Sequence, residues 1–94
     1  MAHREFKDKL YPEFARVAQA LASDRRLELV DLLAQAPRRV EALADETGMT
    51  VANVSQHLQV LKNARLVESE RRGTWAYYRL VPDALRELRQ TLGG

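Results

Sequence analysis

Residues 40–64 of the chain read VEALADETGMTVANVSQHLQVLKNA, two short amphipathic segments on either side of one glycine. The first segment predicts a helix over 40–47 with three apolar residues on one side: Val40, Leu43 and Ala44. Gly48 suits the left-handed residue that ends a helix, and Thr50 suits the N-cap of the next one. Two helices joined by so short a turn form a helix-turn-helix, whose second helix we expect over 50–64.

The second helix has two faces of different chemistry. At about 100° per residue, four apolar residues fall in one sector that should face the core: Val51, Val54, Leu58 and Leu61. The opposite face has no carboxylate and carries Ala52, Asn53, Gln56, Gln59, Val60 and Asn63, with Ser55 and Lys62 nearer its flank. One Asn or Gln side chain can form two hydrogen bonds with an adenine edge, and the Ala side chain can contact a thymine methyl. The alternative is a merely solvated face, which more often shows Glu and Lys pairs.

After Ala64 the pattern changes to that of a hairpin. Residues 66–71 and 74–80 contain the Val, Thr, Trp and Tyr that favour strands, and Arg72-Gly73 between them predicts a tight turn. A helix-turn-helix followed by a hairpin is a winged helix, with the wing over 66–80. Thr50, Lys62 and the tip residues Arg71, Arg72 and Thr74 complete the expected DNA-binding set. The alternative for the tip is a charged turn that discourages edge pairing.

Three aromatic side chains of the hairpin are expected to pack in the core and within the hairpin: Trp75, Tyr77 and Tyr78. They are not expected to form a base-stacking platform, because alternation along a strand puts Tyr78 on the opposite face from the other two. His57 lies between the two faces of its helix, and we interpret it as a packing residue or phosphate donor rather than a metal ligand.

Three further helices are expected, over 5–22, 24–35 and 83–92. Pro12 predicts a kink or a new start in the first, and Ser23 is a good N-cap for the second. The helix over 24–35 should turn four side chains inward: Leu27, Val30, Leu33 and Ala34. The terminal helices carry apolar stripes that need a partner and predict dimerisation through Phe6, Leu10, Phe14, Val17, Leu85, Leu88 and Leu92. The fold class is mainly α with a small β-hairpin, in the order α-α-α-α-β-β-α, forming one domain over 1–94.

Composition narrows the function further. The 94 residues include no cysteine, which removes disulfides, thiolate metal sites and a cysteine nucleophile. The net charge of +2 is too small to indicate nucleic-acid binding alone, but no acidic residue stands between Thr47 and Val67. There is no phosphate-binding Gly-rich loop, so we do not expect an enzyme. No apolar stretch predicts a membrane span or a secretion signal, and a cytoplasmic location is the default expectation.

Three stretches resemble repressors of the ArsR/SmtB type: LASDRRLELVDLL at 21–33, VSQHLQVLKNARLV at 54–67 and RGTWAYYRL at 72–80. The resemblance implies a homodimeric winged-helix repressor of a palindromic DNA operator that dimerises through its first and last helices. It also implies base contacts from Ala52, Ser55 and Gln56. Many members carry Gln where this chain has Val51, so the operator sequence does not carry over.

The sensing sites of the family have no match in this sequence. Residues 37–42 read PRRVEA, without the cysteine pair that many members use to bind metal. Other members bind metal through Asp, His and Glu on the last helix. Here Asp83 and Glu87 have no histidine beside them, and Arg86 and Arg89 add positive charge that disfavours a metal ion. A site from His3, Glu5 and Asp8 is the alternative, but we expect no metal and no cofactor.

The N-terminal residues HREFK at 3–7 and the run VANVSQH at 51–57 also resemble a subgroup fused to a rhodanese domain, which this sequence does not contain. The sequence is compatible with a standalone relative of this subgroup and with a part of such a fused protein. We therefore expect a sequence-specific DNA-binding regulator, a dimer whose partners are double-stranded DNA and a second copy of itself. The alternative is a winged helix used only for protein contact or dimerisation.

Overall fold

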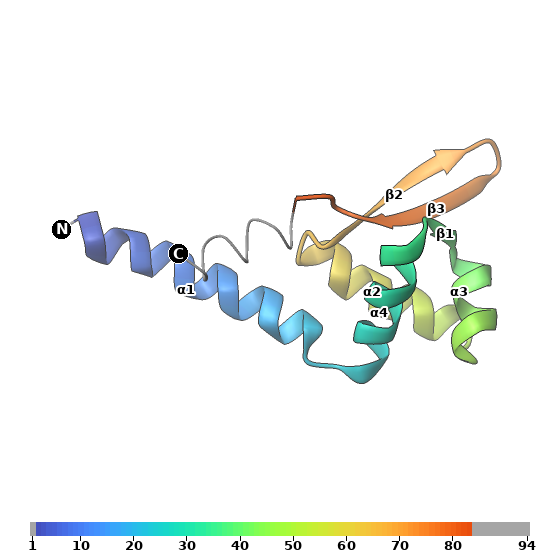
Figure 1. Ribbon diagram of the computed structural model, residues 1–94, viewed down its shortest axis with the longest axis horizontal. Coiled ribbons are helices and arrows are strands. Elements are labelled where there is room, and N and C mark those ends of the chain that lie inside the picture. The colour runs from blue at the N-terminus through green and yellow to red at the C-terminus, as the bar shows by residue number, and fades with distance from the viewer. Residues whose placement is uncertain (1, 84–94) are drawn as a thin grey trace.

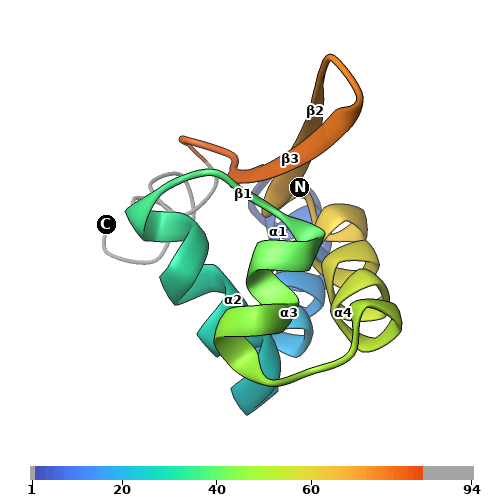
Figure 2. The ribbon, with the colours of Figure 1, turned by 90° about the vertical axis from the view of Figure 1, so that its right-hand side faces the viewer.

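The computed structural model describes residues 2–83, with side chains from residue 4 onward. Four helices and three strands follow one another in the order α1, α2, β1, α3, α4, β2, β3 (Figure 1). The strands form an antiparallel sheet in the order β1-β3-β2, and Figure 2 shows the helices gathered on one side of it. This is the winged helix-turn-helix that the sequence predicts. The helix expected over 83–92, with Leu85, Leu88 and Leu92, falls outside the described residues apart from its first position.

Helix α1 (Ala2–Leu21) begins three residues earlier than the expected residue 5 and is continuous through Pro12. The new start expected at Pro12 is therefore wrong, because the helix does not end and begin again there, and the expected kink stays a prediction. Pro12 is exposed, so solvent can satisfy the carbonyl group that loses its helical partner there. The N-terminal half of α1 extends away from the other helices (Figure 1), and Phe6 is 60% exposed on it. Val17 is only 9% exposed in the protomer's own core, so its expected place in a dimer interface is corrected.

Helix α2 (Asp24–Gln35) has the expected bounds and the expected cap, because the Ser23 side chain accepts a hydrogen bond from the Arg26 backbone N–H. Its buried face is only partly the one expected. Leu33 is 4% exposed and Leu29 is fully buried, whereas Leu27 is 50% exposed and Ala34 is also exposed. Apolar residues occur nearly all round this helix, and at about 100° per residue Leu27 points roughly 200° away from Leu29. The sequence pattern alone therefore could not select the buried side.

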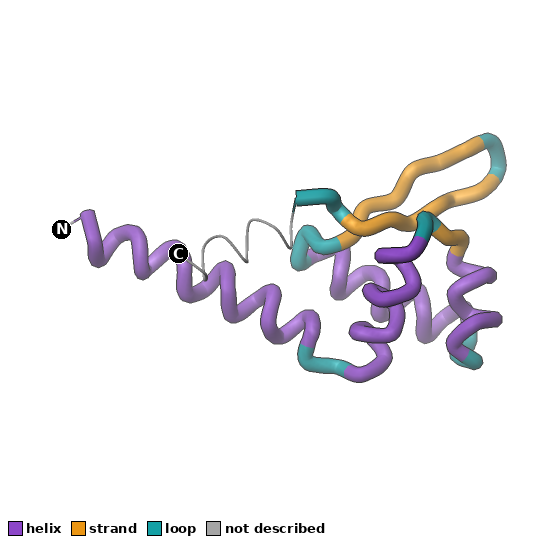
Figure 3. Tube along the Cα trace, in the orientation of Figure 1, coloured by secondary structure: helices purple, strands orange, loops and turns teal. Residues whose placement is uncertain are grey.

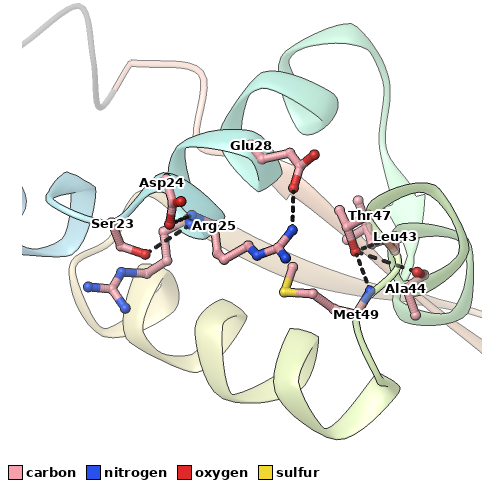
Figure 4. A network of polar contacts seen from close by, with 9 residues as sticks. Ser23, Asp24, Arg25, Glu28, Leu43, Ala44, Thr47 and Met49 are labelled. Carbon is pink, nitrogen blue, oxygen red and sulfur yellow. Dashed lines mark hydrogen bonds and ion pairs between the residues drawn. The ribbon is translucent and has the colours of Figure 1, made fainter.

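Helices α3 (Val40–Thr47) and α4 (Val51–Asn63) meet at the turn that the sequence predicts. Gly48 has a φ of 74° with open space beside it, so the backbone angle is what favours glycine there. The Thr47 hydroxyl donates to the Leu43 carbonyl at 2.7 Å and accepts from the Met49 N–H at 3.3 Å (Figure 4). One side chain thus satisfies backbone groups on both sides of the turn and fixes its shape.

Strands β2 (Val67–Arg72) and β3 (Trp75–Leu80) form the wing, drawn in orange with the rest of the sheet in Figure 3. Arg72 pairs with Trp75, so the two-residue turn is Gly73-Thr74 and not the expected Arg72-Gly73. Gly73 has a φ of 62°, as the first central residue of a tight hairpin turn requires. The short strand β1 (Arg38–Arg39), which pairs with Tyr78 and Tyr77, was not expected.

One hydrophobic core joins the helices to the base of the wing. Its twelve residues come from all four helices and from the start of the hairpin: Val17, Ala20, Leu29, Leu33, Leu43, Ala44, Val54, Leu58, Leu61, Ala64, Leu66 and Val67. The wing is anchored at this end, since the Val81 N–H donates to the Leu66 carbonyl at 2.9 Å. Within residues 2–83, none of the helices combines the length and apolar character needed to cross a bilayer.

Candidate DNA-binding surface

Helix α4 is held at both ends by hydrogen bonds that its own sequence supplies. The Thr50 side chain caps the start by accepting from the Asn53 N–H at 3.1 Å. At the other end the Leu66 N–H donates to the Leu61 carbonyl and the Arg65 N–H to the Lys62 carbonyl, both at 2.9 Å. These two bonds form a Schellman motif, in which Arg65 takes the left-handed position with a φ of 61°. Local hydrogen bonds thus close both ends of α4, and the burial of Val54, Leu58 and Leu61 decides which side of it faces outward.

The face of α4 that turns away from the core is the one predicted to meet DNA. All eight residues assigned to this recognition face and its flank are exposed: Ala52, Asn53, Ser55, Gln56, Gln59, Val60, Lys62 and Asn63. Gln59 donates to the Asn63 side chain at 2.9 Å, one turn further along the helix. Gln56 has no side-chain hydrogen bond to another described residue, so both its amide donor and its acceptor are open to a partner. No acidic residue lies in the first turn of α4.

Val51 does not lie where the sequence analysis placed it. It was expected in the core with Val54, but it is 47% exposed while Val54 is fully buried. Ala64, at 4% exposure, is also part of the buried side and shifts its centre away from Val51. Met49, just before the cap, packs against the core cluster instead, as in a hydrophobic staple. Val51 therefore lies at the flank of the recognition face.

The wing is tied to α4 by Lys62, whose Nζ donates to the Ser69 hydroxyl at 3.3 Å. Side chains alternate along a strand, so Val67, Ser69 and Arg71 share one face of β2. Arg71 thus lies beyond Ser69 on the side of the wing that turns toward α4, and it makes no ion pair with another described residue. Lys62 and Arg71 place positive charge between the helix and the wing tip, where a phosphate backbone would have to run.

The other face of the wing carries arginines stacked on aromatic rings. The Arg72 guanidinium lies 5.0 Å from the centre of the Tyr77 ring and its Nη2 lies 3.7 Å from Glu70 Oε2. Arg39 of β1 lies 4.3 Å from the centre of the Trp75 ring. Trp75 is 48% exposed, so the expectation that it packs in the core is wrong, although it does pack within the sheet. Tyr78, on the opposite face, packs against the core as expected.

His57 is half-buried and connects α4 to other helices. Arg26 Nη1 lies 3.3 Å from His57 Nδ1, and because arginine only donates, the neutral ring carries its proton on Nε2. The same guanidinium donates from Nε to the Ala20 carbonyl at 2.6 Å, at the end of α1. The interpretation of His57 as a packing residue fits this position. Arg26 joins the end of α1 to the middle of α4.

No group of three or more His, Asp or Glu side chains comes together within the described part of the chain. The acidic residues of α3 are partly neutralised, because Glu46 forms an ion pair with Arg38 of β1. Sequence reasoning missed both β1 arginines, since a two-residue strand has no periodicity that reveals it. The signal available was indirect, because an aromatic ring attracts a guanidinium only once the fold brings the two groups together.

Comparison with known proteins identifies the family. Residues 23–69, which span α2, the helix-turn-helix and the start of the wing, match the model for bacterial regulatory proteins of the arsR family. The chain belongs to the ArsR family. The resemblance noted in the sequence is thereby confirmed, and membership of this family makes the winged helix a DNA-binding domain of transcriptional regulation.

Three relatives show how far the similarity extends. A helix-turn-helix transcriptional regulator of Mycobacterium tuberculosis is 48% identical over 82 residues, 87% of this chain and 36% of that protein. The arsenical resistance operon repressor of Bacillus subtilis is 35% identical, over 89% of this chain and 81% of that protein. A homodimeric winged helix-turn-helix DNA-binding domain of Mycobacterium bovis, solved by NMR, gives a TM-score of 0.79 at 47% identity, covering 93% of this chain and 83% of that one. The ArsR-family chain thus spans about a third of the length of the first relative.

Proposed function

We propose that this ArsR-family chain acts as a homodimeric repressor that binds a palindromic operator in double-stranded DNA. The observation that carries the proposal is the recognition face of α4, which is exposed, rich in amides and free of carboxylates, and lies beside a basic wing. A second copy of the chain would present the same face one helical turn of DNA away. The repressor in Bacillus subtilis and the homodimeric domain from Mycobacterium bovis support both parts of the proposal.

The contacts divide into two classes with different consequences. Gln56 and Ser55 would read base edges, because amide and hydroxyl groups form the hydrogen bonds that distinguish bases in the major groove, whereas Ala52 offers only a methyl group to the same edges. Arg71, Arg72 and Lys62 would contact phosphates, which fix the register but carry little sequence information. We propose no metal or cofactor and no catalytic role for these residues.

The dimer would form through the part of α1 that extends from the body of the protomer. Phe6 is 60% exposed there, with Leu10 and Phe14 half-buried one and two turns further along. An apolar stripe of this kind on a helix is typical of a surface that is covered by a partner. We place these three residues in the dimer interface, with Val17 behind them in the core.

The two classes of contact can be separated by measuring affinity against salt. The test uses the duplex that the chain selects from a randomised pool and a scrambled duplex as its comparison. Binding of the chain to each duplex is measured by fluorescence anisotropy at several salt concentrations. Gln56→Ala should reduce the ratio between the two affinities, with a loss of about 1–3 kcal/mol on the selected duplex. Arg71→Ala and Arg72→Ala should weaken binding to both duplexes equally and lower the salt slope by about 1 each.

The proposal fails if the parent chain shows no salt-dependent binding to any duplex. That result would favour a winged helix used for protein contact, since phosphate contacts necessarily release counterions. If binding is steep in salt but Gln56→Ala retains full discrimination, α4 does not read the bases through this residue.

A further inference from the structure

Val51 is an apolar residue that neither packing nor helix formation explains. It is 47% exposed at the first position of α4, and Met49 fills the core beside the cap in its place. A β-branched side chain is also a weaker helix former than alanine or the long polar residues. Its side chain is therefore available to a ligand of this helix.

The surroundings of Val51 indicate which ligand group it meets. Ala52 follows it on the exposed surface, and Ser55 stands one turn later on the same side as Val51. No carboxylate or basic side chain lies in this first turn. In a helix-turn-helix the N-terminal residues of the second helix are the ones that reach base edges in the major groove.

Only one group on those base edges is apolar, the C5 methyl of thymine. We propose that Val51 determines specificity by packing its γ-methyl groups against one thymine methyl in each half-site of the operator. This inference rests on the proposed function. It adds that one position of each half-site is read by an apolar contact rather than by a hydrogen bond.

The size of the effect follows from the methyl group that is buried. Removing one buried methyl costs about a fourfold loss of affinity, and about fifteenfold when both half-sites lose it. Replacing thymine by deoxyuridine removes only that methyl and leaves base pairing unchanged. The substitution therefore isolates the contact.

The test uses the full chain and the duplex it selects from a randomised pool. Thymines are exchanged for deoxyuridine one symmetric pair at a time, and the dissociation constant is measured for the parent, Val51→Ala and Val60→Ala. Val60 is the matched control, because it is also an exposed valine of α4, at 40%, but lines a hollow between α1 and α4 with Arg16 and Arg26. Thermal melting of each variant verifies that it is folded.

We expect one thymine pair whose exchange weakens binding of the parent about fifteenfold. Val51→Ala should bind the thymine and deoxyuridine duplexes equally, while Val60→Ala should keep the full difference. If Val51→Ala loses affinity for every duplex, Val51→Ser provides the same comparison with a side chain that suits the start of a helix.

The inference is overturned if no exchange affects the parent, or if both Val51 variants keep the parent's sensitivity to the methyl. The second result would assign the methyl contact to another residue such as Ala52. Either outcome leaves the proposed function intact, because the selected duplex is still bound. A chain that selects no duplex at all instead contradicts the proposed function.

Discussion

Replacing Arg65 by glycine is expected to stabilise the domain. Arg65 is the residue after the C-cap of α4, and its φ of 61° is one that side chains disfavour and glycine adopts freely. It is exposed, and it makes no ion pair with another described residue, so the substitution removes no visible side-chain contact. The two hydrogen bonds of the Schellman motif use backbone groups only and should remain.

The magnitude follows from two opposing terms. The left-handed conformation costs a residue with a Cβ about 1–2 kcal/mol in the folded state. Glycine is more flexible in the unfolded chain, which offsets about 0.4–1 kcal/mol of that gain. The free energy of unfolding should therefore rise by about 0.5–1 kcal/mol, and Tm by roughly 2–8 °C for a domain of this size.

Thermal and urea unfolding followed by circular dichroism measure this change. Parent and variants are compared at one protein concentration, because dimerisation makes Tm concentration-dependent. Arg65→Ala is the control, since it removes the charge but keeps the Cβ and should leave Tm nearly unchanged. A Tm for Arg65→Gly at or below that of the parent would refute the reasoning. An equal rise in both variants would show that the charge, and not the backbone, was unfavourable.

Three further substitutions test other parts of the structure. Thr50→Ala removes the cap of α4 and should lower the unfolding free energy by about 1 kcal/mol, while Thr50→Ser should not, as urea denaturation would show. Leu61→Ala opens a cavity at a fully buried position and should cost about 2–5 kcal/mol by the same measurement; a loss below 1 kcal/mol would contradict its place in the core. Phe6→Asp should convert the dimer to a monomer in sedimentation velocity at low micromolar concentration, and an unchanged sedimentation coefficient would remove α1 from the interface.

The helix-turn-helix was predictable from sequence because local chemistry defines its boundaries. Gly48 ends α3 through its own backbone conformation, and Thr50 caps α4 through its own side chain. Both residues hold the positions predicted from the sequence. The exposed polar residues of α4 were predictable because most of its apolar residues gather on the opposite side of the helix. The wing was predictable from its own pattern, because strand-forming residues on either side of a glycine turn indicate a hairpin.

Features that depend on contacts distant in the sequence were not predictable. The exposed positions of Val51 and Leu27 follow from which side of each helix the neighbouring helices cover. The pairing of β1 with β3 and the stack of Arg39 on Trp75 arise only when residues far apart in the chain meet. Periodicity assigns a residue to a face, and tertiary packing decides which face is covered.

Selection of duplexes from a fully randomised pool by the intact chain tests the central claim most directly. The account predicts enrichment of an inverted repeat whose half-site centres lie about 10 base pairs apart, with A·T pairs where Gln56 and Val51 reach the bases. Enrichment should weaken as salt rises, in step with the number of phosphates contacted. Recovery of sequences with no common motif, or of a motif without two-fold symmetry, would contradict the claim that this domain reads DNA as a symmetric dimer.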